Sequence, residues 1–283
     1  MVIKDYWCLT KEEKILVNKF RDTDFTELAE EKVYDYGKGM LFAFEGQKPM
    51  GSVLVVLEAA EMLKTAYIYR MAIEGENVDI FKELMKIAVN TARKYGARRI
   101  FLGSNDDKIW KVAGTIGIHK EYGAYTMELM DRDIKEKLLE TEALTMDNLK
   151  TYVVIFNEAF NDMPHGCYRS AEEMQELMMD KDNNKEFFIV KYKGEPVGFI
   201  ETTIEDDEGF FDLGLRASAR GKNLGRRLLE TAISILREKN TDKICLTVIE
   251  RNAVAFEMYK RRGFEIKNVY SYWTEISDTH KFL

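Results

Sequence analysis

The chain has few cysteines and no long apolar run. Its three cysteines, Cys8, Cys167 and Cys245, are scattered along 283 residues and show no spacing typical of a metal site. We therefore expect reduced thiols, no bound metal and a cytoplasmic location. No apolar stretch approaches the ~20 residues that a membrane-spanning helix requires. The first ten residues also lack a secretory core, so we expect no association with a membrane.

Excess positive charge is absent as well, because the formal net charge is −7. Phosphate contacts dominate affinity for nucleic acid, so this acidity argues against nucleic-acid binding. A hydrophobic content of 46% with 32% charged residues predicts a soluble protein with ample core, in one large or two ordinary domains. Its oligomeric state stays open between monomer and homodimer.

One segment runs against the acidic composition. Residues 213–229 read LGLRASARGKNLGRRLL and predict a strand end, a glycine-bearing turn and an amphipathic helix. The segment contains no acid and five basic residues, Arg216, Arg220, Lys222, Arg226 and Arg227. A helix start offers free N–H groups and a positive dipole end, which suit a phosphate or pyrophosphate. A phosphate loop of the Walker A type is excluded because Asn223 stands where Ser or Thr is required, and a dinucleotide fingerprint is excluded because the glycines are spaced wrongly.

The run Arg220-Gly221-Lys222-Asn223-Leu224-Gly225 resembles the acyl-CoA pyrophosphate loop of the GNAT N-acetyltransferase superfamily, Gln/Arg-x-x-Gly-x-Gly/Ala. Asn223 replaces the first glycine of that pattern, and asparagine tolerates the left-handed backbone region. A second motif, Asn252-x-x-Ala255-x-x-Met258-Tyr259-x-x-x-Gly263-Phe264, resembles the GNAT strand and helix that carry a tyrosine. Two motifs in this order predict a GNAT fold for residues 140–283.

The first half of the chain repeats features of the second. Residues 42–53 mirror the hairpin of residues 188–200, and the helix–strand pair 81–102 parallels 225–246 at an offset of 144. We predict an α/β protein of two tandem GNAT-like domains, each a mixed, mostly antiparallel twisted sheet flanked by helices. The domains are residues 1–135 and residues 136–283. A chance likeness of generic hairpins is the alternative.

The two copies differ where chemistry would occur. In place of the basic loop the first copy has IEGENVDI at residues 73–80, with three acids and no base, which would repel a pyrophosphate. It also has Trp110 and no tyrosine in the helix after its strand. We expect a degenerate unit without a donor site, whose work is structural or which forms one wall of the acceptor cleft.

Several further elements are predicted from periodicity and caps. We expect helices from Thr10 onward and over residues 22–36, with Asp22 or Asp24 as a cap. Residues 131–146 are expected to form a polar, helical linker. Two more helices should follow, the second capped by Ser170, and one or two strands should close the chain over residues 266–276.

The resemblance implies direct transfer of an acyl group, usually acetyl, from acetyl-CoA to an amine. A backbone N–H near Leu215 would polarise the thioester oxygen. Tyr259 matches the family's general acid, and a phenol with a reference pKa of ~10 can protonate a thiolate whose thiol has a pKa of ~8.5. The implied donor contacts are Leu213, Leu215, Arg220, Gly221, Lys222, Asn223, Leu224, Gly225, Arg226, Asn252, Ala255 and Tyr259.

The residue that deprotonates the amine is less defined. Gly209 and Phe211 stand in register with the family's usual base and cannot serve. Asp212 is the nearest carboxylate, although strict alternation directs it to the other sheet face unless a bulge intervenes. Glu201 on the preceding strand is a second candidate. Further rivals are Glu250 and His165, and an amine of low pKa would need no base.

The loop of residues 161–169 is expected to border the acceptor pocket, with Phe160, His165 and Tyr168 in contact with the acceptor. We expect a small-molecule or amino-acid-like amine. Two other functions remain open, a non-catalytic CoA-binding regulatory module and a protein N-terminal or lysine acetyltransferase.

Overall fold

The computed structural model of the chain describes residues 1–30, 36–180 and 184–277. The chain divides into two compact units: unit 1 is Met1–Gly123 with Ser271–Leu283, and unit 2 is Ala124–Tyr270. The expected boundary between residues 135 and 136 falls inside unit 2. Within the described ranges no helix has the length and hydropathy needed to cross a membrane.

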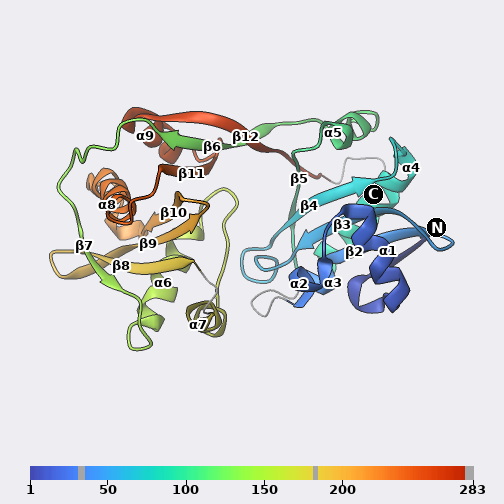
Figure 1. Ribbon diagram of the computed structural model, residues 1–283, viewed down its shortest axis with the longest axis horizontal. Coiled ribbons are helices and arrows are strands. Elements are labelled where there is room, and N and C mark those ends of the chain that lie inside the picture. The colour runs from blue at the N-terminus through green and yellow to red at the C-terminus, as the bar shows by residue number, and fades with distance from the viewer. Residues whose placement is uncertain (31–35, 181–183, 278–283) are drawn as a thin grey trace. The chain divides into compact units, whose positions relative to one another are not determined.

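Unit 1 is a mixed sheet with helices on both faces (Figure 1). Its strand order is β1-β2-β3-β4-β5-β12, with β4 and β5 parallel and the other neighbours antiparallel. Helices α4 and α5 pack on one face, while α1, α2 and α3 pack on the other. The elements are β1 (Val2–Asp5), η1 (Tyr6–Cys8), α1 (Lys11–Arg21), α2 (Phe25–Glu30), α3 (Tyr36–Gly39), β2 (Met40–Glu45), β3 (Lys48–Val56), β4 (Thr65–Ile73), α4 (Val78–Lys94), β5 (Arg99–Ser104) and α5 (Asp107–Gly114).

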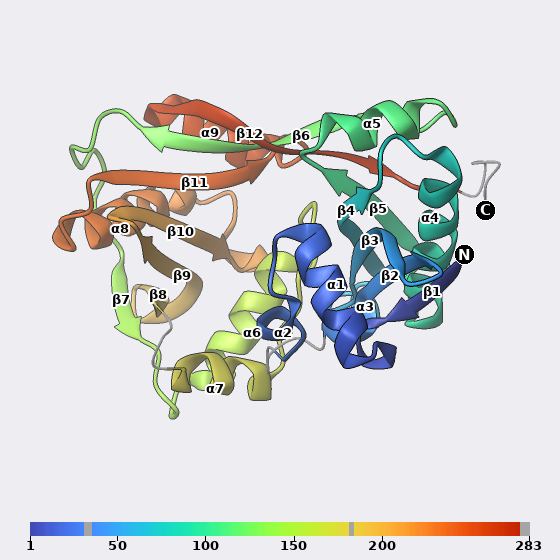
Figure 2. The same ribbon diagram turned by 45° about the vertical axis from the view of Figure 1, so that its right-hand side comes forward.

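Unit 2 has the same layering around a sheet of order β12-β6-β11-β10-β9-β8-β7. The ladder of β10 with β11 is parallel, and those of β6 with β11 and of β7 through β10 are antiparallel. Helices α8 and α9 cover one face, and α6 and α7 cover the other, as Figure 2 shows for α6 and α8. The elements are β6 (Tyr122–Leu129), β7 (Glu140–Ala143), α6 (Leu149–Phe160), α7 (Ala171–Met179), β8 (Lys185–Tyr192), β9 (Glu195–Glu205), β10 (Glu208–Leu215), η2 (Ala217–Ala219), α8 (Leu224–Glu238), β11 (Lys243–Ile249), α9 (Ala253–Arg262) and β12 (Phe264–Glu275).

The internal repeat extends to local irregularities. The β2–β3 ladder shifts register between Ala43 and Phe44, and the β8–β9 ladder shifts between Val190 and Lys191. Both shifts lie opposite a Pro-x-Gly step, which inserts one extra residue into β3 and into β9. The expected mixed α/β fold with a repeated unit is therefore confirmed.

Local signals located most helix ends. Thr10 and Ser170 each begin their helix with a capping box, and Gly263 ends α9 with a left-handed φ of 101°. Asp24 accepts a hydrogen bond from Thr26 N at the start of α2, whereas Asp22 closes α1. The part of the helix expected over residues 31–35 lies outside the described residues.

The helical linker expected over residues 131–146 is wrong. This segment contains no helix, and its residues Glu140–Ala143 form β7, which pairs with β8. The reason is tertiary: without β7 the outer strand β8 would present an unpaired edge. The earlier part is held by Arg262, whose guanidinium donates to the carbonyl oxygens of Asp131 at 2.8 Å and Asp133 at 2.7 Å.

The last strands of the two halves are exchanged. Strand β6 follows α5 of unit 1 in the chain, yet it pairs with β11 over Ala124↔Ile249 to Glu128↔Cys245. Met127 and Leu129 of β6 are buried in the core of unit 2. Conversely, the end of β12 pairs with β5 of unit 1 over Tyr272↔Ser104 to Glu275↔Phe101. Each sheet is thus completed by a strand from the other half of the sequence.

This exchange predicts which fragments fold. A fragment of residues 136–283 lacks β6 and leaves the edge of β11 and part of the core exposed, so we expect it to aggregate or to unfold without cooperativity. A fragment of residues 122–277 retains β6 and should unfold cooperatively. Differential scanning calorimetry and near-ultraviolet circular dichroism compare the two, and equal cooperativity would contradict the role assigned to β6.

Candidate active site

Two parallel strands of unit 2 diverge at the centre of its sheet. Strands β10 and β11 pair only from Glu208↔Lys243 to Phe210↔Cys245. Beyond that point β10 stays with β9 as far as Leu215, and β11 stays with β6 as far as Ile249. After Phe210 the edge of β10 that faced β11 has no strand partner among the described residues, so backbone N–H and C=O groups on that side lack ladder hydrogen bonds. Such groups need partners, and an extended ligand with amide groups could supply them.

The predicted donor residues lie where β10 leads into α8. Leu213 and Leu215 are on the diverging part of β10. Gly221 has φ 75° and Asn223 has φ 58°, so asparagine takes the left-handed conformation that the family pattern assigns to glycine. Asn223 makes no side-chain capping hydrogen bond, which leaves the first N–H groups of α8 available. Leu224 is buried, and a Cβ added to Gly225 would lie 3.4 Å from Met258 Sδ.

Most of the arginines in the basic segment hold the loop in place. Arg220 forms a two-point ion pair with Asp162 at 2.6 and 3.0 Å, and it also donates to the carbonyl oxygens of Ala159 and Leu215. Arg220 keeps the pKa of the Asp162 carboxyl below its usual value. Arg216 similarly pairs with Glu158 at 2.7 and 2.9 Å. These contacts fix the loop to the end of α6, so the side chain of Arg220 is committed to structure.

Of the three remaining basic residues, two are better placed for a phosphate. Arg227 donates to the carbonyl oxygens of Lys137 and Leu138. Arg226 is exposed and its one ion pair, with Glu136, is long at 3.8 Å. Lys222 is exposed and has no ion pair with any residue that the structure describes. Lys222 and Arg226 are therefore the side chains of this segment that could neutralise a diphosphate.

Tyr259 lies on α9, on the side of the sheet that carries Phe211. Its ring packs edge-on against Phe211 and Phe264, with centroids 6.4 and 5.8 Å away. Burial, and then the charge of Asp212, raise the pKa of the Tyr259 phenol above its ordinary value. Its hydroxyl makes no hydrogen bond within the described part of the chain. The phenol is therefore neutral at physiological pH.

The second motif has the expected helix start. Asn252 caps α9 by accepting from Ala255 N at 3.4 Å, and its amide lies 4.0 Å from Met163 Sδ. Asn252 and Ala255 are both half-buried. Asn252 therefore serves as the N-cap of α9.

Asp212 and Glu201 face each other across β10 and β9 as a paired position of the ladder. Both lie on the α6 side, because Glu201 bonds to α6 and Phe211 faces the opposite core, as alternation predicts. Asp212 is exposed to solvent, although the neighbouring protein atoms reduce the hydration of its carboxyl. Burial, followed by the charge of Glu201, raises the pKa of Asp212 to about 6. Asp212 is thus the carboxyl with the properties of a base near neutral pH.

Glu201 has a structural environment. Only 4% of its surface is exposed, and Oε1 accepts from Tyr152 Oη at 2.5 Å and from the guanidinium of Arg169. The Arg169 guanidinium also stacks over Phe156, 4.3 Å from the ring centroid. The sequence analysis missed Tyr152 and Arg169. The signal was an acid on an apolar strand, since a buried carboxylate requires a cation and hydrogen-bond donors.

The predicted acceptor residues flank this network. Phe160 packs against Phe156 and Phe199, with ring centroids 4.8 and 5.6 Å away. His165 and Tyr168 are half-buried in the following loop, where His165 has a φ of 58°. Asn157 holds the loop by bonding to both the N–H and the C=O of Arg169. The rival Glu250 accepts from Tyr125 Oη on β6 at 3.5 Å.

Unit 1 has the same divergence, but it is covered. Strands β4 and β5 pair from Thr65↔Arg99 only to Ile68↔Leu102. The Trp273 ring lies over both strands: it stacks on Tyr69 of β4 at 5.5 Å, and a Cβ on Gly103 of β5 would fall 2.5 Å from it. Trp110 Nε1 donates to the carbonyl oxygen of Ser104 at the end of β5. Aromatic side chains therefore occupy the place that a donor would need.

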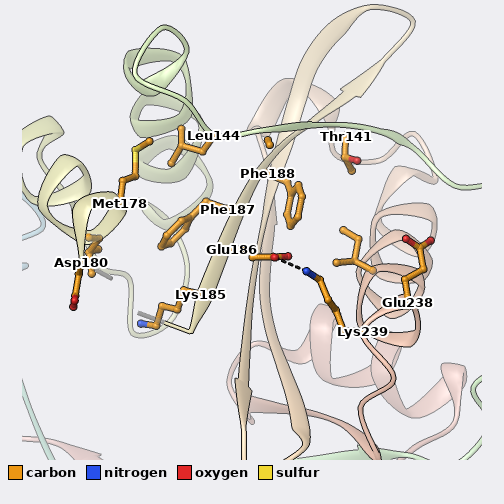
Figure 3. A pocket seen from close by; sticks show the side chains of 13 residues that line it. Thr141, Leu144, Met178, Asp180, Lys185, Glu186, Phe187, Phe188, Glu238 and Lys239 are labelled. Atoms are coloured by element: carbon orange, nitrogen blue, oxygen red, sulfur yellow. Dashed lines mark hydrogen bonds and ion pairs between the residues drawn. The ribbon is translucent and has the colours of Figure 1, made fainter. Parts of the chain in front are cut away.

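A separate hollow of about 580 Å³ lies where β7 ends beside β8 in unit 2 (Figure 3). Phe187 and Phe188 form its centre, and Glu186 pairs with Lys239 across it. None of the predicted donor or acceptor residues lines it, so we place neither substrate there. No cluster of three or more potential metal ligands occurs in residues 1–30, 36–180 and 184–277.

Residues 152–264, from α6 to the start of β12, match the acetyltransferase (GNAT) family, which confirms the resemblance carried by the two motifs. The chain is 26% identical over 141 residues to an uncharacterized N-acetyltransferase of Methanocaldococcus jannaschii, covering 46% of this chain and 62% of that protein. It is 29% identical over 127 residues to the mycothiol acetyltransferase of Propionibacterium freudenreichii, covering 42% and 41%. The chain therefore spans less than two thirds of either relative's length.

Solved structures share the fold over most of the chain. A GCN5-related N-acetyltransferase from Anabaena variabilis matches with a TM-score of 0.63 at 12% identity, covering 97% of this chain and 72% of that one. A GCN5-related N-acetyltransferase from Sphaerobacter thermophilus gives 0.59 at 13% identity, covering 97% and 95%. A tandem GNAT protein from the clavulanic acid biosynthesis pathway gives 0.54 at 14% identity, covering 84% and 83%. These likenesses show that the chain shares the mixed α/β fold of these proteins.

The unequal roles of the basic residues predict distinct effects of substitution. Lys222→Glu and Arg226→Glu should each raise the dissociation constant of coenzyme A roughly tenfold at low salt and less at high salt, since both charges are exposed. Arg220→Ala should instead lower the melting temperature, because the loop loses its attachment to α6. Titration calorimetry and thermal denaturation measure the two effects. Arg237→Glu at the far end of α8 is the matched control, and an equal loss of affinity there would refute a local site.

Proposed function

We propose that the protein transfers an acetyl group from acetyl-CoA to the amine of a small or amino-acid-like acceptor. The observation that carries this proposal is the divergence of β10 from β11, with Asp212 on the α6 side of β10 and Tyr259 of α9 on the opposite side, beside Phe211. GNAT proteins generally use acetyl-CoA, and the residues present suit that donor. The diverging edge of β10 offers partners for amide groups, and the start of α8 offers N–H groups and Lys222 for a diphosphate.

The chemical roles follow from protonation states. Above pH 6 Asp212 is ionised and can accept a proton from the acceptor amine as its nitrogen attacks the thioester carbonyl. A backbone N–H of the diverging edge, near Leu215, can donate to the oxyanion that forms. Tyr259 can then protonate the departing thiolate, because its raised pKa keeps the phenol neutral. Glu201 acts on Asp212 as a neighbouring negative charge and is not itself the base.

The acceptor class follows from charge. Asp212 and Glu201 place two carboxyl groups on the α6 side of β9 and β10, where Phe160 and the loop carrying His165 and Tyr168 also lie. Arg169 neutralises Glu201, so one negative charge remains for a cationic amine.

A screen of amines with acetyl-CoA, monitored by release of free thiol, tests the proposal. Failure of every amine while coenzyme A still binds would favour the regulatory module.

The pKa of Asp212 predicts a pH dependence. Below about pH 6 the carboxyl is protonated and cannot accept a proton, so kcat/KM for the amine should rise with pH through about 6. Asp212→Asn should abolish this limb and lower kcat by about 10²–10⁴-fold. Steady-state kinetics between pH 5 and pH 9 measure the profile. Asp207→Asn, in the exposed turn before β10, is the control, and an unchanged limb in Asp212→Asn would remove Asp212 from the reaction.

The substitution Tyr259→Phe separates the effect of proton donation from the effect of ring packing. The variant keeps the ring contacts with Phe211 and Phe264 and removes only a hydroxyl, so the melting temperature and the affinity for coenzyme A should change little. We expect kcat to fall by about 10²–10⁴-fold. Tyr270→Phe removes an exposed hydroxyl from β12 and should leave kcat unchanged. Wild-type turnover by Tyr259→Phe would assign the acid role elsewhere.

A further inference from the structure

The repeat allows unit 1 to be compared with the candidate active site position by position. Gly51 of β3 corresponds to Gly198 of β9, so Leu54 corresponds to Glu201. Leu54 pairs with Tyr69 of β4, just as Glu201 pairs with Asp212 of β10. The two acids of unit 2 are therefore replaced by an apolar residue and an aromatic one in unit 1.

At this place unit 1 gains an arginine that unit 2 does not have. Ser52 pairs with Ala72 and Leu54 pairs with Tyr69, so β4 contains one residue more than β3 across this step. Arg70 lies in this bulge with a φ of 50°, a conformation that residues other than glycine, asparagine and aspartate rarely adopt. Bulges of this kind redirect side chains and are frequent beside functional sites.

A second arginine, Arg21, ends α1, the helix that packs over the same face of β3 as Leu54. Its Nε is buried and has no hydrogen-bond partner among the described residues. Burial, followed by the charge of Arg70, lowers the pKa of Arg21, and Asp106 opposes this effect. Asp106 is already engaged, since its carboxylate caps α5 by accepting from Lys108 N. Neither Arg21 nor Arg70 forms an ion pair with a residue that the structure describes.

Ser52 contributes a third donor from the neighbouring strand. Its side chain is 3% exposed, and Oγ lacks a partner within the described ranges. Ser52 lies two residues before Leu54, which packs against the core under α1, so both occupy the face that carries α1. Arg21 Nε and Ser52 Oγ are buried donors without acceptors among the described residues, which is costly, while the exposed Arg70 adds a third donor at the surface.

We propose that Arg21, Arg70 and Ser52 form a binding site in unit 1 for the phosphate or carboxylate group of a small molecule. Arginine forks match the oxygen geometry of both groups. The anion supplies the acceptors and the negative charge that this cluster lacks. Unit 1 therefore keeps the acceptor side of the repeated fold with its charge reversed, and the site does not depend on acyl transfer.

Titration calorimetry with inorganic phosphate at constant ionic strength tests the site. The donor loop of unit 2 could also bind phosphate, so the titration uses a Lys222→Glu/Arg226→Glu background. We expect saturable binding that Arg70→Asn weakens at least tenfold, because asparagine accepts the left-handed backbone but cannot supply the charge. Arg21→Gln should have a similar effect, and Lys86→Gln on the exposed face of α4 should alter the affinity less than twofold.

Acetate, titrated in the same way, distinguishes the two ligand groups. Tighter binding of phosphate would assign a tetrahedral anion to the site, and tighter binding of acetate would assign a planar one. In either case the preferred anion must bind at least tenfold more weakly to Arg70→Asn. Binding that is equal in Arg70→Asn and the background protein overturns the proposal, as does displacement by an equal concentration of chloride. Because the donor loop is disabled throughout, failure here leaves the acetyltransferase proposal intact.

Discussion

The divergence of two parallel strands is the constraint on which the rest of unit 2 depends. Once β10 and β11 separate after Phe210, β10 can be stabilised only from the β9 side and β11 only from the β6 side. The facing edges of the two strands then have no ladder partners among the described residues. In unit 1 the same separation is covered by the Trp273 ring, and Trp110 bonds to the end of β5. The same divergence of two parallel strands is therefore covered by aromatic side chains in unit 1, whereas in unit 2 it is the place where we propose that the donor binds.

The candidate site could be predicted where it depends on local chemistry. Glycine and asparagine mark the left-handed positions at Gly221 and Asn223, and Asn252 and Gly263 mark the ends of α9. The roles of the arginines could not be read in this way, because Arg220 is bound by Asp162, 58 residues earlier in the chain. The sequence shows that a segment is positively charged, but only the folded structure shows which of its charged side chains bond to other protein groups.

The fold was predictable to a similar depth. Periodicity and caps located most helices and strands, and the hairpin repeat indicated two copies. The prediction failed at Glu140–Ala143, where an exposed polar segment forms a strand. It does so because β8 would otherwise present an unpaired edge. The exchange of β6 and β12 was also out of reach, since β6 has the same local preference for a strand whichever sheet it joins. Buried networks such as Arg169 with Glu201 leave only an indirect trace, an acid in an apolar strand.

The exchanged strands have a consequence for how the chain acquires its structure during synthesis. Unit 1 contains the first 123 residues, yet β5 obtains its outer neighbour only when Tyr272–Glu275 of β12 have been made. The sheet of unit 1 therefore keeps an open edge at β5 while more than a hundred further residues are synthesised. Contacts between residues so far apart in the sequence also form slowly. The nascent polypeptide is therefore exposed to intermolecular strand pairing for much of its translation, and chaperone protection of β5 would have its greatest value there.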